Sequence, residues 1–156
     1  MRRVIVYCSF IISTIGCRSE NSDNQRTDSS IAYLDSVAIA KPTIDTLCFE
    51  ERVGKDLTNV RLIINGDSVT GNMEWLPWEK DRARGTLKGK KNGNEIIADY
   101  DYIIEGSNQL EEKVFILDGD KLLIKSGELE EKNGKLLMKD PAKATIGQTL
   151  TKKVCQ

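Results

Sequence analysis

Acidic and aromatic side chains are the residues of this sequence whose types and spacing suit catalysis or ligand binding. Asp99 and Asp101 stand two residues apart, and paired carboxylates perform general acid–base chemistry when they face each other across a cleft. Trp75 and Trp78 flank Pro77, and an aromatic pair of this kind can form a platform for a small ligand or a saccharide. Histidine is absent, which removes the commonest general base and the commonest metal ligand. Ser-His or Cys-His nucleophiles and a His-based zinc site are therefore excluded.

The acidic positions are better explained by a solvent-facing surface. Residues i and i+2 of a strand point to the same side, so Asp99 and Asp101 cannot oppose each other across a cleft. Asp118-Gly119-Asp120 begins like a calcium loop, but the alternating ligands do not follow and a hairpin turn explains it better. We predict no catalytic residue, no metal site and no cofactor. An enzyme, a hydrolase using carboxylates alone, ranks last among the function classes.

A stripe of apolar residues lies on the strand face opposite these aspartates. The segment Glu95–Glu105 alternates strictly and places on one face Ile96, Ala98, Tyr100, Tyr102 and Ile104. Inside a barrel this stripe either belongs to a packed core or lines a ligand cavity, and the alternation leaves both open. The candidate binding residues are therefore Trp75, Trp78, Tyr100 and Tyr102.

The elements that must position these side chains are short strands joined by tight turns. From Asp45 onward the apolar pattern has period two, and turns such as Asn65-Gly66-Asp67 recur about every ten residues. Beyond a first strand that contains Cys48, the pattern predicts strands over residues 57–64, 68–76, 85–89, 95–105, 109–117, 121–129, 135–139 and 150–155. We predict an all-β fold, a lipocalin-like antiparallel up-and-down barrel of about eight strands, with a β-sandwich as the alternative.

The amino terminus has the three zones of an export signal. Arg2 and Arg3 are followed by the apolar run Val4–Ile15 and then by Thr14-Ile15-Gly16-Cys17. The apolar run has about a dozen residues, whereas a membrane-spanning helix needs roughly 20. Thr14-Ile15-Gly16-Cys17 resembles the lipobox of bacterial lipoproteins, with Thr14 in place of the usual Leu. The resemblance implies cleavage before Cys17 and attachment of a diacylglycerol to its sulfur, which would hold the chain to a membrane. The alternative is an ordinary secretory signal.

The segment that follows Cys17 suits a tether. Residues 18–30 contain no aliphatic or aromatic side chain, so they have nothing to bury in a core. We expect a signal peptide over residues 1–16, a lipidated amino terminus with a flexible tether over residues 17–44, and a barrel domain over residues 45–156.

A second resemblance covers about residues 45–155. The runs GTLKGKKNGNEIIADYDYIIEG and GELEEKNGKLLMKDP, with a terminal cysteine, resemble a group of small uncharacterised lipoproteins of Gram-negative envelopes. The resemblance implies a barrel in the cell envelope, anchored to a membrane that we expect to be the outer membrane. It implies no activity.

Two cysteines remain after Cys8 leaves with the signal peptide and Cys17 takes the lipid. In an oxidising compartment, Cys48 and Cys155 are most simply a structural disulfide that joins the first strand to the carboxyl end. The alternatives are two free buried thiols or a redox pair, although the chain has no CxxC motif.

Charge and composition limit the partners. The formal net charge of −1 falls by two, to −3, when Arg2 and Arg3 are removed, so a nucleic-acid partner has no electrostatic basis. We predict a lipid-anchored, non-catalytic barrel that binds a small apolar ligand or an envelope protein. The alternative is a structural or inhibitory interaction protein with a solid core.

Overall fold

The structure is a computed structural model that describes residues 43–156. The predicted signal peptide, the lipidation site Cys17 and the predicted tether up to residue 42 lie outside the described residues. The elements are β1 (Ile44–Val53), β2 (Asp56–Asn65), β3 (Ser68–Leu76), β4 (Ala83–Asn92), β5 (Glu95–Ile104), β6 (Ser107–Asp118), β7 (Lys121–Ser126), β8 (Leu129–Lys132), β9 (Lys135–Met138), the 3-10 helix η1 (Pro141–Lys143) and β10 (Thr145–Lys153).

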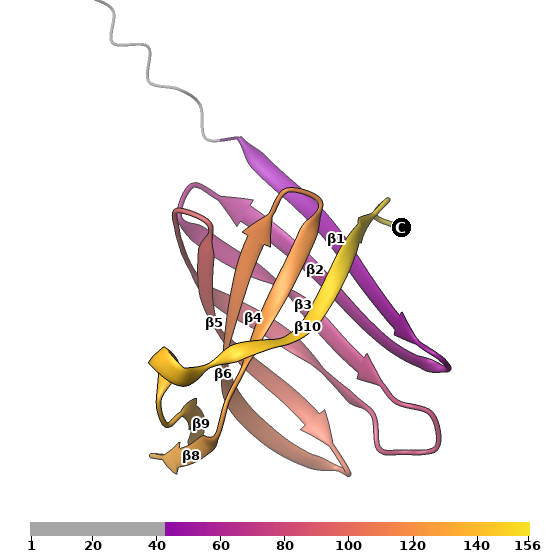
Figure 1. The fold of residues 1–156 in the computed structure, drawn as a ribbon, viewed down its shortest axis with the longest axis vertical. Coiled ribbons are helices and arrows are strands. Elements are labelled where there is room, and N and C mark those ends of the chain that lie inside the picture. The colour runs from indigo at the N-terminus through magenta and orange to yellow at the C-terminus, as the bar shows by residue number, and fades with distance from the viewer. Residues whose placement is uncertain (1–42) are drawn as a thin grey trace, which may run out of the picture. The chain divides into compact units, whose positions relative to one another are not determined.

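Eight of the strands form a closed antiparallel up-and-down barrel (Figure 1). Each strand from β1 to β6 pairs with the next one in the chain, and β10 lies between β7 and β1 as the eighth strand of the ring. The ring closes where residues 48–50 of β1 pair with residues 151–153 of β10. The predicted eight-stranded barrel is therefore confirmed, and closure of the ring excludes the β-sandwich alternative.

The hairpin of β8 and β9 fills a gap in the wall. β7 pairs with β6 only between Phe115 and Asp118 and then diverges toward β10. Beyond that point β9 lies beside β6, with Leu136 opposite Glu111 in a parallel bridge. The hairpin thus borders the barrel at the end where β6 and β7 separate.

Period-two alternation explains why these residues form the barrel, because inward and outward side chains alternate along each strand. The buried inward residues come from all eight strands and include Phe49, Val60, Leu62, Val69, Leu87, Ile96, Ala98, Phe115, Leu122 and Leu150.

Glycines of β4 allow the wall to bend. A Cβ on Gly85 would lie 2.6 Å from the Cα and Cβ of Tyr102, so the close approach of β4 and β5 requires glycine there.

Three predicted strand boundaries were wrong. The strand predicted over residues 85–89 extends from Ala83 to Asn92, because pairing with β3 and β5 on both sides incorporates its charged ends. The strand predicted over residues 121–129 ends at Ser126, where β7 leaves β6. The last strand begins at Thr145 and not at residue 150, since its amino-terminal half pairs with β7.

The two ends of the barrel differ. One end carries the β2–β3, β4–β5 and β6–β7 turns together with the start of β1, and the other carries the β1–β2, β3–β4 and β5–β6 connections and the β8–β9 hairpin (Figure 1). All barrel strands, the core and both cysteines of the disulfide lie within residues 44–155, so this segment contains a complete barrel.

Candidate functional site

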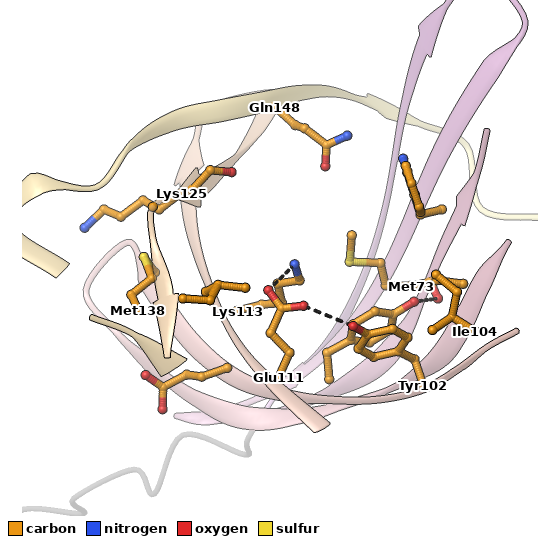
Figure 2. Close-up of a pocket in the computed structure, with 15 residues that line it drawn as sticks. Met73, Tyr102, Ile104, Glu111, Lys113, Lys125, Met138 and Gln148 are labelled. Carbon is orange, nitrogen blue, oxygen red and sulfur yellow. Dashed lines mark hydrogen bonds and ion pairs between the residues drawn. The ribbon is translucent and has the colours of Figure 1, made fainter. Parts of the chain in front are cut away.

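The interior of the barrel is open at the end that carries the β3–β4 and β5–β6 connections. A cavity of about 380 Å³ lies there. Its lining comes from each strand from β3 to β10 and from Gly127, which lies between β7 and β8. The lining residues are Met73, Trp75, Ala83, Tyr100, Tyr102, Ile104, Glu111, Glu112, Lys113, Lys125, Ser126, Gly127, Leu129, Met138 and Gln148 (Figure 2). The opposite end is filled by the packed core. The interior of the barrel is therefore packed with side chains at one end and contains an open cavity at the other.

The predicted tyrosines form one wall of this cavity. The rings of Tyr100 and Tyr102 are stacked with centroids 4.4 Å apart and planes 12° from parallel. The Tyr100 hydroxyl donates to the carbonyl oxygen of Met73 at 3.0 Å, and that of Tyr102 donates to Gln109 Oε1 at 3.1 Å. Burial, and then the charge of neighbouring Glu111, raise the pKa of Tyr102, and burial raises that of Tyr100 well above its usual range. Both phenols stay protonated and available as neutral hydroxyls.

A charged pair lies inside the cavity, on β6. Lys113 Nζ donates to Glu111 Oε1 at 2.6 Å, and the two side chains are only 21% and 11% exposed. The register places Glu111 opposite Tyr100 and Lys113 opposite Ala98, on the inward face of the strand. Figure 2 shows Glu111 between Lys113 and Tyr102. A buried carboxylate and ammonium are stable together because each satisfies the other.

Sequence reasoning missed this pair. Its signal was present, because Glu111 and Lys113 share the alternation of Phe115, which is fully buried. The predicted strand over residues 109–117 was not assigned an inward face, so the charges were not recognised as interior.

The wall opposite the tyrosines comes from β10 and β9. Gln148 lies across the cavity from Tyr102 (Figure 2), and its Nε2 donates to Thr58 Oγ1 at 3.1 Å. Met138 of β9 is buried at the side of the cavity. The β8–β9 hairpin, which interrupts the simple meander, thus contributes directly to the lining.

The structure separates the two predicted tryptophans. Trp75 lines the cavity at its mouth and is 37% exposed. Trp78 does not belong to the lining: it is 51% exposed on the β3–β4 loop, where its ring lies under Lys55 and its backbone N–H donates to Asp56 at 2.7 Å. Of the four candidate binding residues, the structure brings together Trp75, Tyr100 and Tyr102.

The remaining cysteines form the disulfide that was predicted. Cys48 of β1 is bonded to Cys155, two residues beyond β10, with Cα atoms 5.3 Å apart. Because β1 and β10 are the first and last strands, the bond crosses the seam at which the barrel closes.

The acidic positions have structural explanations. Asp99 points outward and forms an ion pair with Lys135 of the β8–β9 hairpin, and Gly119 has the positive φ of a tight turn between β6 and β7. Within residues 43–156, no three Asp, Glu or Cys side chains gather closely enough to hold a metal ion.

The fold and the cavity define a class: a small β-barrel domain with an interior that is open at one end. Comparison with protein-family models, with curated proteins and with solved structures found no match. The described part of the chain contains no helix with the length and hydrophobicity of a membrane-spanning segment.

Proposed function

We propose that this protein is a lipid-anchored lipoprotein of the bacterial cell envelope whose barrel binds a small ligand without transforming it. The open-ended cavity carries the proposal. Apolar walls with a few convergent polar groups are the usual make-up of a small-molecule site, and this cavity combines both in an interior that the core leaves unfilled. A solid-core interaction protein would have no reason to keep that volume open.

The anchor rests on the amino-terminal sequence. Gly16-Cys17 after a short apolar run favours lipidation of Cys17, and the polar residues 18–30 suit a spacer between lipid and barrel. The disulfide agrees with a domain outside the reducing cytoplasm. We place the lipid in the outer membrane, by the resemblance to Gram-negative envelope lipoproteins.

A protein partner at the rim is the second candidate function. Val53 at the end of β1, Trp75 near the end of β3 and Trp78 on the β3–β4 connection are exposed large apolar residues at the open end of the barrel. Exposed apolar side chains on one rim suit a protein contact. A partner bound there would cover the mouth of the cavity.

The tryptophans provide a matched test of the ligand site. A Trp78→Phe variant keeps only Trp75, which lines the cavity, and a Trp75→Phe variant keeps only Trp78, which does not. Titration with a small-molecule extract of the envelope is expected to change the emission of the first variant saturably and to leave the second unchanged. Equal responses of the two variants would assign the signal to the surface and not to the cavity.

Metabolic labelling tests the anchor. In the producing bacterium, an alkyne-bearing fatty acid is expected to label the wild-type chain. The labelled chain is expected in the outer-membrane fraction. Cys17→Ser should abolish labelling and membrane retention through lipid, whereas Cys48→Ser should leave the label in place. Labelling of the Cys17→Ser chain would refute the assignment.

A further inference from the structure

The charges that border the cavity cancel one another. Glu111 and Lys113 pair inside it at 2.6 Å. The side chains of Lys125 and Glu112 also line the cavity, but each has a partner for its charge. Lys125 pairs with Glu95 at 2.9 Å, and Glu112 pairs with Lys135 at 3.2 Å. An ionic ligand would compete with these pairs, and one that displaced Lys113 would leave the buried Glu111 carboxylate without its partner. The lining therefore favours a ligand without net charge.

Polar groups of the lining retain hydrogen-bonding capacity. The ammonium of Lys113 has three N–H groups and, among the described residues, uses one of them on Glu111. Glu111 Oε2 has a long 3.5 Å contact to the Tyr102 hydroxyl, whose single proton has a nearer acceptor in Gln109 at 3.1 Å. Donors and acceptors thus lie side by side, and a hydroxyl group satisfies both because it donates and accepts.

The same groups count against a purely apolar ligand, which the sequence had suggested. Such a ligand would displace water from Glu111 and Lys113 without replacing its hydrogen bonds, and that desolvation is costly. The aromatic side chains supply an apolar surface of a different kind. Trp75 and Tyr102 both line the cavity, and the face of an aromatic ring has a partial negative charge that attracts the slightly positive C–H groups of a sugar ring.

We infer that the cavity binds an uncharged polyhydroxylated ring, a saccharide, with its C–H face on Trp75 and its hydroxyls on Glu111 and Lys113. This inference rests on the proposed function and specifies its ligand class. The volume of about 380 Å³ is at the small end of ligand sites, and suits about one or two sugar rings.

Three sugars that differ by one group test the charge argument. Glucose is neutral, glucosamine carries an ammonium and glucuronate a carboxylate on the same ring. Calorimetry on residues 19–156, which contain the complete barrel, measures the binding of these three sugars. It also measures the binding of maltose, of N-acetylglucosamine and of the uncharged apolar dye N-phenyl-1-naphthylamine. We expect a neutral sugar to bind saturably and at least tenfold more tightly than its charged counterparts.

Variants locate the binding. We expect Trp75→Ala to weaken binding of the neutral sugar at least tenfold. The near-isosteric double variant Glu111→Gln with Lys113→Gln should weaken it to the same degree. Trp78→Ala should not change affinity, because Trp78 is outside the lining. Circular dichroism and the mass of the intact disulfide verify that each variant is folded.

The outcomes separate the inference from the proposed function. Tighter binding of a charged sugar would overturn the inference that the ligand is an uncharged saccharide. Binding of the apolar dye or an envelope metabolite in the cavity, with no binding of any neutral sugar, would overturn it too. Both results would leave the proposed ligand site in place. Equal loss on Trp75→Ala and Trp78→Ala overturns the assigned location. Absence of saturable binding by every probe and by the envelope extract overturns both.

Discussion

Charged residues on the inward face of β6 define the site at the scale of single residues. The alternation along Gln109–Leu117 predicts that Glu111 and Lys113 share a face with Phe115, but it does not indicate which end of the barrel is open. A charged inward residue is tolerated only at an open end, where its head can reach a partner and water. The tyrosine stripe was predictable because its inward residues are mostly apolar, whereas the paired charges are polar and could be recognised as interior only by extending the alternation of Phe115 along β6.

Gly85 is a residue that the bend of the wall requires. A Cβ there would overlap the carbonyl oxygen of Asp101 and approach Tyr102 to 2.6 Å, so Gly85→Ala is expected to lower the free energy of unfolding by about 1–3 kcal/mol. Gly127→Ala is the matched control, since its nearest neighbours would be at 3.6–3.8 Å. Urea denaturation measures both, and equal stabilities of the two variants would contradict the close approach.

The stacked tyrosines predict a decline of stability in alkali. Burial raises the pKa of Tyr100 and Tyr102 in the folded chain, while the unfolded phenols titrate near pH 10. Above about pH 10 the unfolded state therefore releases protons that the folded state keeps, and the free energy of unfolding falls as pH rises. Denaturation between pH 8 and 11 should show a steeper fall for the wild type than for Tyr100→Phe with Tyr102→Phe. Parallel profiles would refute the buried state of the phenols.

At the scale of elements, the hairpin of β8 and β9 is attached to the wall through Lys135. Burial disfavours the charge of Lys135, but hydrogen bonds with Asp99 and Glu112 outweigh burial and raise its pKa. The sequence predicted β9 as a strand but not its place beside β6, because a parallel bridge has no local turn to indicate it.

Removal of that attachment should be measurable. Lys135→Ala is expected to lower the free energy of unfolding by about 0.5–1 kcal/mol and to speed hydrogen exchange in the hairpin. Lys132 lies on the same hairpin but is itself exposed and, in the described structure, is paired only with partly exposed Glu130. Lys132→Ala is therefore expected to change neither the stability nor the exchange rate. If both variants exchange at the wild-type rate, Lys135 does not hold the hairpin.

At the scale of the whole molecule, an antiparallel up-and-down barrel was predictable from short strands joined by regular turns. The open end was not, because it depends on how far β7 diverges from β6 and on which side chains fill the space. The described chain enters β1 at the closed end, opposite the mouth of the cavity. A ligand of the proposed site would therefore approach from the side away from the start of β1.

The disulfide stabilises the closed ring as a whole. It closes a loop of 107 residues across the seam, for which chain entropy gives about 4–5 kcal/mol as an upper figure. Cys48→Ser with Cys155→Ser is expected to lower the free energy of unfolding by up to that amount and to leave ligand affinity within about twofold, because the bond is outside the cavity lining. A loss of binding in a variant that remains folded would contradict this separation of seam and site.

Native mass spectrometry of residues 19–156, exported without the lipid, tests the central claim most directly. We predict a native mass that exceeds the denatured mass by the mass of one small molecule. This excess should be reduced in Trp75→Ala and retained in Trp78→Ala. The denatured chain itself should be two hydrogens lighter than its sequence, because of the disulfide. Equal native and denatured masses, even after incubation with the envelope extract, would contradict the claim that the open end of the barrel is a ligand site.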